Sequence, residues 1–575
     1  MDQKRLLTAI VASIAILVVF QWLTPHSRRP LPPPAAAVQQ TLTPSGAPLA
    51  GQVPVPAAAP VPRDVPRLKI DGPRVAGSIS LLGARFDDVV LRDYRETIEK
   101  SSPLVRLLES RADPQPYYMQ FGWSAAPGTT VRLPDNDTVW SGSGEVTPGK
   151  PALLSWDNGE GQTFEIAVSV DDNYLFSVRQ RVRNTGLESV SLYPWSRIRR
   201  DYAPKTQGYY ILHEGLLGVL GGVLKEQTYA TVKSEGDKKG GISFESTGAG
   251  GWAGITDKYW LVTLVPDQAA TQTASFRHIS EAGQDGYQVD FVSTVPQTVA
   301  PGAEVSADSR AFAGAKEVNL LARYESHANI PLFSYAVDWG WFWFLTKPFF
   351  YALDWLYWVF GNFGVAIIVF TVFVKAVFFP LANKSYRSMS KMKLLAPKMS
   401  ALKEQYKDDP AKLQQQMMAL YKAEKVNPAS GCLPMFVQIP VFFSLYKVIF
   451  ITIEMRHAPF FGWIRDLSAV DPTNIFNLFG FIPFNPAQYS SLLHLGAWPL
   501  MMGVTMYFQQ KLNPPPPDPM QAKIFQWMPV MFTFMLANFP AGLVIYWTWN
   551  NLLTIGQQWL ILRQTTLDKP RLART

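Results

Sequence analysis

The chain has 575 residues, of which 53 are lysine or arginine and 45 are aspartate or glutamate, so its formal net charge is +8 at pH 7. Its only cysteine, Cys432, excludes an intramolecular disulfide and a cysteine-ligated zinc site. No HExxH, P-loop, GxGxxG or GxSxG pattern is present. The sequence therefore predicts no catalytic residues, no metal site, no cofactor and no enzymatic activity.

The N-terminal residues indicate a membrane anchor followed by a spacer. Lys4 and Arg5 precede an apolar run over residues 6–23, which is longer than the apolar core of a cleaved signal peptide and has no small-residue cleavage site close behind it. We expect an uncleaved transmembrane anchor at residues 1–24, with its N-terminus in the cytoplasm. Residues 25–66 are rich in proline and alanine and predict an extended linker.

Residues 67–322 predict one all-β domain. Apolar residues alternate with polar ones over 164–170 and again over 174–182, on either side of Asp171-Asp172-Asn173, which is typical of a hairpin with one buried face. Short strands between Gly, Pro and Asp turns indicate a two-sheet sandwich. Four tryptophans of this domain either form a sugar-binding platform or pack in the core, and core packing is favoured. These residues are Trp123, Trp140, Trp195 and Trp252.

Residues 323–360 are crowded with aromatic side chains and interrupted by Asp338, Lys347 and Asp354. Such a segment suits the membrane surface, where amphipathic rings lie at headgroup depth. We expect an amphipathic interfacial helix lying flat on the outer face of the membrane.

Residues 361–381 predict the second transmembrane helix, and they contain a cation. The run is long enough to cross about 30 Å of hydrocarbon, yet it carries Lys375, and a lysine at the centre of a span costs about 2.5–3.5 kcal/mol on insertion scales. Thr371 lies one turn before it on the same helix face. Lys375 either extends toward the cytoplasmic headgroups or is a functional cation, and both interpretations remain open at this point.

Residues 382–432 predict a cytoplasmic helical hairpin. Ten cations and four acids between residues 383 and 425 leave a net charge of +6, and basic loops stay in the cytoplasm. Asp409-Pro410 predicts an N-cap and a first-turn proline for the second helix. An apolar seam at helical spacing either joins the two helices or receives partners, or does both; its members include Met392, Leu395, Met399, Leu402, Tyr406 and Met417.

The rest of the chain predicts four more spans. These are residues 433–453, 492–510, 524–539 and 542–562, joined by a half-embedded periplasmic loop at 454–491 and a cytoplasmic loop at 511–523. Lys447 lies near the outer end of the first of them and is expected to extend toward the headgroups. The basic tail at 563–575 places the C-terminus in the cytoplasm. The predicted fold class is thus an α-helical polytopic membrane protein with six transmembrane helices, of which five form the core, plus an all-β sandwich domain.

Polar side chains recur in the five C-terminal spans, but no acidic residue lies near mid-bilayer to neutralise Lys375. A buried cation without an anion needs water or carbonyl groups around it. We therefore expect a hydrated groove that opens toward the cytoplasm and attracts polar, acidic segments of another chain. The polar groups in these spans are Thr371, Lys375, Gln438, Thr533, Tyr546, Asn550 and Asn551.

Several runs resemble the YidC/Oxa/Alb family of membrane-protein insertases, in its Gram-negative form. They are KAEKVNPASGCLPMFVQIP at 422–440, together with VKAVFFPL, SMSKM, MRHAPF, WIRDLSA and FPAGLVIYW. The resemblance implies a periplasmic β-supersandwich similar to sugar mutarotases and a five-helix core with a hydrophilic groove. It places the groove cation, usually arginine, on Lys375, the substrate-contacting threonine on Thr371 and a substrate-contacting tyrosine on Trp547, beside Tyr546. Glu424 matches a residue of the cytoplasmic hairpin.

The resemblance implies an insertase and chaperone of the bacterial inner membrane that folds nascent membrane proteins, alone or with the Sec translocon. The basic hairpin and tail predict a weak contact with the ribosome. The +6 charge of the hairpin accounts for most of the chain's basic excess, so we expect no binding to a specific nucleic-acid sequence. The lipid bilayer is the remaining partner. A solute transporter with a periplasmic binding domain is the alternative, although no paired repeat with broken helices supports it, and an envelope enzyme acting on sugars is a third possibility.

Overall fold

The computed structural model describes residues 65–206, 212–281, 283–407, 409–424, 426, 433–484, 486–490, 493–513 and 519–567. The predicted anchor at 1–24 and the linker at 25–66, except its last two residues, lie outside this part of the chain. Residues 427–432 of the predicted hairpin, which include Cys432, and residues 568–575 of the predicted tail also lie outside it.

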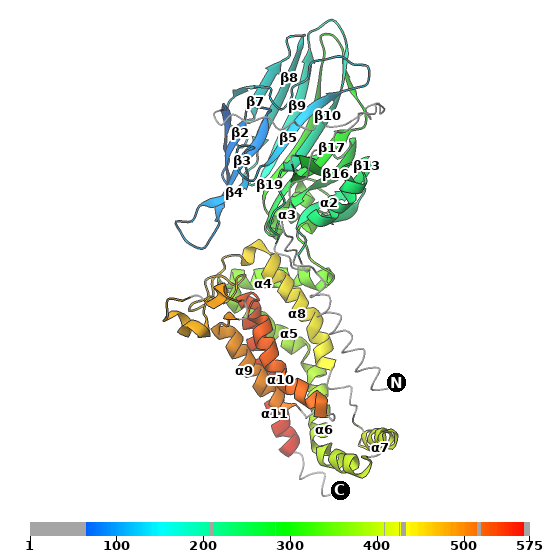
Figure 1. Ribbon diagram of the computed structural model, residues 1–575, viewed down its shortest axis with the longest axis vertical. Helices are drawn as coiled ribbons and strands as arrows, with labels where there is room; N and C mark the ends of the chain where they lie inside the picture. Colours follow the sequence, from blue (N-terminus) through cyan, green and yellow to red (C-terminus); the bar gives the residue numbers. More distant parts are fainter. Residues whose placement is uncertain are drawn as a thin grey trace, which may run out of the picture. The chain divides into compact units, whose positions relative to one another are not determined.

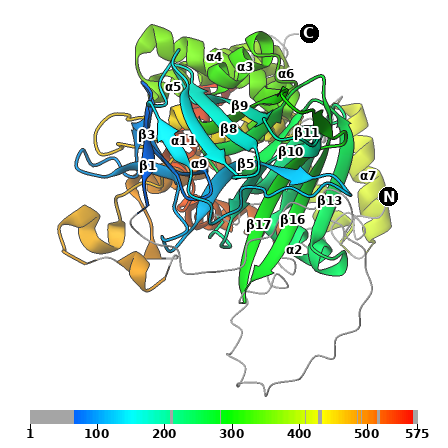
Figure 2. The same ribbon diagram turned by 90° about the horizontal axis from the view of Figure 1, so that it is seen from above.

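The first part of the described chain is a two-sheet β-sandwich, as predicted. Figures 1 and 2 show β5, β10, β17 and β16 running side by side in the larger sheet. That sheet has the strand order β1-β2-β3-β5-β10-β17-β16-β13, with β4 paired to β3 and β18 paired to β10. Its strands are β1 (Arg67–Asp71), β2 (Val75–Ser80), β3 (Arg85–Arg95), β4 (Leu104–Leu108), β5 (Tyr117–Ala125), β10 (Val190–Arg200), β13 (Ile242–Ala249), β16 (Thr271–Glu281), β17 (Gln284–Ser293) and β18 (Gln297–Val299).

The second sheet has the order β12-β11-β14-β15-β19-β9-β8-β7-β6. Its β8 and β9 form the predicted hairpin, since Val168 faces Val178 in an antiparallel register and the alternate residues of β8 are buried. The strands are β6 (Ser141–Ser143), β7 (Ala152–Asp157), β8 (Gln162–Val170), β9 (Leu175–Asn184), β11 (Gly215–Leu220), β12 (Val223–Thr228), β14 (Trp252–Thr256), β15 (Trp260–Pro266) and β19 (Glu304–Ala315).

Aromatic rings join the two sheets. The ring of Trp123 on β5 lies 5.2 Å from that of Phe164 on β8, and the ring of Phe86 on β3 lies 6.1 Å from that of Phe176 on β9. Edge-to-face pairs of this kind add to the stabilisation from buried apolar area. All four tryptophans considered for a sugar platform are buried, so core packing is confirmed for them.

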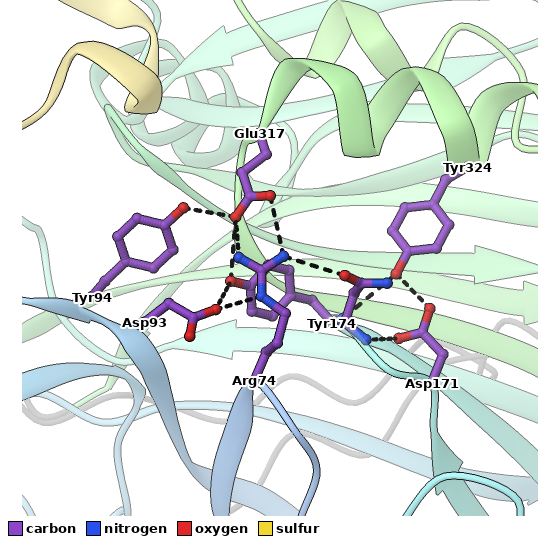
Figure 3. A network of polar contacts seen from close by, with 8 residues as sticks. Arg74, Asp93, Tyr94, Asp171, Tyr174, Glu317 and Tyr324 are labelled. Carbon is purple, nitrogen blue, oxygen red and sulfur yellow. Dashed lines mark hydrogen bonds and ion pairs between the residues drawn. The ribbon is translucent and has the colours of Figure 1, made fainter. Parts of the chain in front are cut away.

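A polar network fixes the point where the chain leaves the sandwich. Arg74, which follows β1, forms ion pairs with Asp93 on β3 and with Glu317, the N-cap residue of α3 (Val318–His327). Its guanidinium carbon also lies 4.5 Å from the centroid of the Tyr174 ring. The Tyr94 hydroxyl donates to Glu317 at 2.7 Å, as Figure 3 shows. Because both sheets contribute to this network, it sets where α3 begins.

The second part of the described chain is helical. Here α4 packs against α5 and α8, while α11 packs against α5, α6, α8 and α9, and α10 packs against α9. The helices are α2 (Tyr229–Lys238), which lies on the sandwich, α3, η1 (Phe333–Ala336), α4 (Trp343–Phe360), α5 (Phe363–Val377), α6 (Phe379–Gln405), α7 (Pro410–Ala423), α8 (Leu433–Ile451), η3 (Ile453–Met455), η4 (Ile475–Gly480), η5 (Pro486–Gln488), α9 (Ala497–Leu512), α10 (Pro519–Leu536) and α11 (Ala541–Leu567).

Two predicted helices are divided in the structure. The segment at 323–360, expected as one helix, consists of the end of α3, η1 and α4. The span at 361–381 is broken at Phe378, and α5 and α6 meet at an angle of 68°. Pro380 explains the break, because a proline lacks the backbone N–H for helix continuation and disfavours a helical residue before it.

A helix that crosses a bilayer must be both long and apolar. Within the described ranges, no single helix meets both requirements. The bent pair of α5 and residues 379–392 meets them jointly, and residues 436–451 of α8 form a shorter apolar helix.

Lys447 on α8 has a carboxylate partner. Its Nζ lies 2.7 Å from Asp338 Oδ2, its side chain is only 10% exposed, and it also donates to the Asp338 carbonyl oxygen at 3.1 Å. The prediction that Lys447 extends toward the headgroups is therefore wrong. The nearby anion offsets part of the cost of burying the ammonium group.

Candidate functional site

Lys375 lies in the last turn of α5, and the local sequence explains how that helix is placed. Gly361 ends α4 with a φ of 66°, a left-handed conformation that glycine adopts without strain. Asn362 then caps α5, because its side chain accepts a hydrogen bond from the Val365 N–H at 3.1 Å. This tight connection reverses the chain and sets α5 against α4.

The Lys375 ammonium group contacts the last helix. Its Nζ donates to Thr554 Oγ1 on α11 at 2.7 Å, and Thr554 Oγ1 donates to the Asn550 carbonyl oxygen at 2.7 Å. Among the residues that the structure describes, no carboxylate forms an ion pair with Lys375. A half-buried cation with one hydroxyl partner still has hydrogen-bonding capacity for water or a ligand.

A small cavity adjoins Lys375. Its volume is about 40 Å³, and its walls come from α5, α6 and α8. That volume has room for about two or three water molecules. Lys375, Tyr386 and Gln438 contribute the polar wall, and the bend between α5 and α6 brings Phe378 and Leu381 into the apolar wall.

Gln438 connects the cavity with α11. Its Nε2 donates to the hydroxyl group of Tyr546, which is 2% exposed. The next residue, Trp547, is half-buried, and its ring lies 4.7 Å from that of Phe442 and 6.0 Å from that of Phe532. The structure thus places Lys375 and Gln438 on the wall of one cavity, with Tyr546 bonded to Gln438 and Trp547 packed among aromatic rings.

The remaining predicted groove residues lie elsewhere. Thr371 is buried, its hydroxyl group donates to the Ile367 carbonyl oxygen of its own helix at 2.7 Å, and it does not line the cavity. Thr533 faces Gly503 on α9. Asn551 donates to Thr505 Oγ1 on α9 at 3.2 Å. Thr533 and Asn551 therefore belong to the contacts of α9 with α10 and α11.

Two residues of the site were missed from the sequence. Thr554 continues the polar stripe of α11 one turn beyond Asn550, so extending the helical spacing would have found it. Tyr386, which lines the cavity and is placed to interact with Thr554 and Gln558, carried no comparable signal, because it lies in the basic segment assigned to the hairpin.

The segment predicted as a cytoplasmic hairpin corresponds to most of α6 and to α7. Asp409 caps α7 by accepting from the Lys412 N–H at 3.0 Å, and Pro410 follows it, as predicted. The Tyr421 hydroxyl contacts Met399 Sδ at 3.8 Å, and Lys398 pairs with Glu424 at 2.7 Å. The seam residues Met392, Met399, Leu402 and Met417 are only half-buried, so the seam retains surface for a partner.

Two family models cover nearly all of the described chain. The model described as "60Kd inner membrane protein" matches residues 355–569, and "YidC periplasmic domain" matches residues 67–352. The chain belongs to the YidC family of membrane protein insertases. The β-sandwich accordingly corresponds to the family's periplasmic domain, and the helices from residue 355 onward correspond to the part matched by the inner-membrane-protein model.

Full-length relatives agree with this membership. A membrane protein insertase YidC of Granulibacter bethesdensis is 59% identical, with 100% of both chains covered, and one of Acidiphilium cryptum is 53% identical, with 98% of both covered. A solved structure of an active YidC insertase with its first transmembrane domain resolved is 18% identical, with a TM-score of 0.36, and covers 86% of this chain and 93% of its own.

The family assignment settles the class of function. The YidC relatives are named as membrane protein insertases, which is a non-enzymatic function. Their names confirm the predicted insertase function and agree with the prediction that the chain is not an enzyme. The YidC family acts on nascent membrane proteins. The comparisons give no support to the solute transporter that was the alternative.

Proposed function

We propose that the chain inserts nascent membrane proteins by holding their polar ends at the cavity around Lys375. The observation that carries the proposal is the pairing of a half-buried ammonium group with a hydroxyl group and a water-sized cavity, with no carboxylate partner in the described part of the chain. An acidic or polar segment of a substrate would supply the missing charge and hydrogen bonds. Gln438 and Thr371 are the accompanying groove residues in this proposal, with Tyr546 and Trp547 on the last helix and Thr533 and Asn551 deeper in the helix group.

The apolar part of the substrate would move along the outer surfaces of α5 and α8. Large apolar side chains on these helices are exposed, among them Phe373 at 62% and Phe436 at 66%. Each Å² of apolar surface that the substrate moves from water into such surroundings contributes about 25 cal/mol. The half-buried methionines of the hairpin would receive the segment first, because flexible thioether side chains adapt to varied sequences.

The topology that we propose has six transmembrane segments and both termini in the cytoplasm. The charge of the loops supports it, because the segment between residues 383 and 425 has a net charge of +6 and the tail is basic. The domain boundaries are those predicted from the sequence, with the 361–381 segment bent at Phe378. The same basic hairpin and tail would give weak contact with a ribosome, and family membership supports cooperation with the Sec translocon.

Charge-reversal variants in proteoliposomes test the groove cation. Lys375→Glu should impair insertion of a substrate with an acidic translocated tail and spare one whose tail is neutral, while Lys375→Arg should retain both. Lys384→Glu is the matched control, because Lys384 is exposed on α6 and the same charge change there leaves the cavity intact. Equal insertion of the acidic substrate by Lys375→Glu and wild type would rule out the groove-cation role.

A further inference from the structure

The segment between α8 and α9 contains a group of exposed apolar side chains that the candidate site does not use. Residues 475–484 are here called the apolar loop. No aspartate, glutamate, lysine or arginine lies between Asp471 and Lys511. Contiguous apolar surface of this kind marks an interaction site. The large exposed side chains are Phe476, Leu478, Phe479, Phe481, Ile482 and Phe484, of which Phe481 is 90% exposed.

Several backbone N–H groups of the apolar loop are bonded by Asn474 and Asn477. Asn474 Oδ1 accepts from the Phe476 N–H at 3.1 Å, and the Asn474 carbonyl oxygen accepts from the Phe479 N–H at 2.8 Å. Asn477 does the same for the second half of the loop, accepting from the N–H groups of Gly480 at 2.9 Å and Ile482 at 3.1 Å. An irregular backbone needs such internal partners where water is scarce.

Two of the exposed side chains stand on an unfavourable backbone conformation. Leu478 has a φ of 52° and Phe479 a φ of 58°, a left-handed conformation that costs bulky residues about 1 kcal/mol or more each. The loop therefore maintains a conformation that displays apolar groups, at the expense of local stability.

The base of the loop is fixed to the starts of two helices, α9 and α11. Asp471 accepts from the Trp498 N–H of α9 at 2.8 Å and from Trp463 Nε1 at 3.1 Å. The Ala541 N–H at the start of α11 donates to the Ala469 carbonyl oxygen at 2.7 Å, next to the turn that ends α10. In Figures 1 and 2 the gold-coloured segment before α9 extends sideways from this end of the helix group.

We propose that the apolar loop inserts into the outer leaflet of the lipid bilayer, at the boundary between headgroups and acyl chains. The proposal rests on the topology proposed above, in which α9 begins and α10 ends at the outer surface. Lipid is the occupant because the loop has no charge to pair with a protein partner, has several of its backbone N–H groups already bonded, and precedes a helix, α9, that also exposes apolar residues such as Val504 at 55%.

Single-cysteine labelling of the full-length protein tests this contact. The only native cysteine is removed by Cys432→Ser, and an environment-sensitive fluorophore is attached at Phe481→Cys in lipid vesicles. Leu187→Cys is the control, because Leu187 is apolar and 96% exposed on the periplasmic domain. We expect a blue-shifted signal at 481 that lipids with a shallow spin label quench, and an iodide quenching constant several-fold lower than at 187. Phe476→Cys should behave like Phe481→Cys.

Two results would overturn the proposal. Iodide quenching at 481 equal to that at 187 would place the loop in water, and protection from both quenchers would indicate a protein contact instead. The quenching measurement needs no substrate protein. The ability of the same labelled proteins to insert a substrate is therefore measured in a separate assay. Insertion with a water-exposed loop would reject the lipid contact alone, whereas a lipid-quenched loop without insertion would reject only the proposed function.

Discussion

The ammonium group of Lys447 and the carboxylate of Asp338 form a shielded ion pair, with 2.7 Å between Nζ and Oδ2. Asp338 also accepts hydrogen bonds from the N–H groups of His213 and Gly340, each at 3.0 Å. The pair therefore connects the segment before α4, the chain leading into β11, and α8. Its contribution to stability depends on both partners, because each is costly to bury alone.

Removal of one partner should destabilise this junction. Lys447→Met leaves the largely buried carboxylate of Asp338 without its cation. This should lower the free energy of unfolding by about 3 kcal/mol. The double variant Lys447→Met/Asp338→Asn should recover part of the loss in a thermal melt in detergent. Arg179→Met is the control, because Arg179 and Asp308 are exposed at 63% and 57%, and such pairs contribute about 1 kcal/mol or less. Equal effects at both pairs would contradict the prediction.

Glu454 predicts a pH-dependent contact between α3 and the end of α8. The Val318 N–H donates to Glu454 Oε1 at 2.8 Å, while Oε2 is buried without a hydrogen-bond partner in the described ranges. Burial raises the pKa of Glu454 to about 8 from 4.5. The neutral carboxyl group thus stabilises the fold fully below pH 4.5, and this contribution falls by about 1.4 kcal/mol per pH unit until it is lost as the pH passes about 8.

Glu454→Gln should remove that dependence. The variant remains neutral at every pH, so its melting temperature should exceed that of the wild type increasingly between pH 6 and pH 8. Glu304→Gln, at an exposed position of β19, should follow the wild type throughout. Parallel curves for Glu454→Gln and the wild type would mean that Glu454 is already ionised in the folded protein.

Local patterns in the sequence were sufficient for local structure. The β8–β9 hairpin followed from alternation around Asp171-Asp172-Asn173, and the start of α7 followed from Asp409-Pro410. Hydropathy was a weaker guide to where a helix bends, because it sums the apolar character of a segment and carries no information on backbone direction. Residues 361–381 are predominantly apolar, yet Pro380 bends the helix at that place.

Long-range partners could not be predicted in this way. Lys375 was recognised as an unusual cation, but its partner Thr554 lies 179 residues away. Lys447 was assigned to the headgroups for the same reason, because Asp338 lies 109 residues away in a segment expected at the membrane surface. Which buried charges are paired depends on tertiary packing, and no periodicity encodes it.

Helix contact at Gly503 gives a further prediction. A Cβ atom at Gly503 would lie 2.0 Å from Thr533 Oγ1, which is held by its hydrogen bond to the Pro529 carbonyl oxygen. Gly503→Ala should push α9 and α10 apart and lower the melting temperature by several degrees, although alanine favours a helix by about 1 kcal/mol over glycine. The second substitution Thr533→Ala in the same chain should restore most of the lost melting temperature.

Gly556→Ala on α11 is the control for this experiment, because within the described ranges no atom beyond its own stretch of helix lies within 4 Å of the added Cβ. This variant should be neutral or slightly stabilising. Destabilisation by Gly556→Ala as large as by Gly503→Ala would show that the contact with Thr533 is not the cause.

The hydrogen bond between Gln438 and Tyr546 predicts unequal effects of removing its two partners. The Tyr546 hydroxyl is buried, so Gln438→Leu leaves it without a partner and should cost about 2 kcal/mol. Gln438 lines the cavity, so after Tyr546→Phe its amide can bind water instead, and the cost should be nearer 1 kcal/mol. The double variant Gln438→Leu/Tyr546→Phe should be more stable than Gln438→Leu alone. A larger loss for Tyr546→Phe, measured by thermal melts in detergent, would mean that water does not reach the cavity and would also weaken the case for a hydrated site at Lys375.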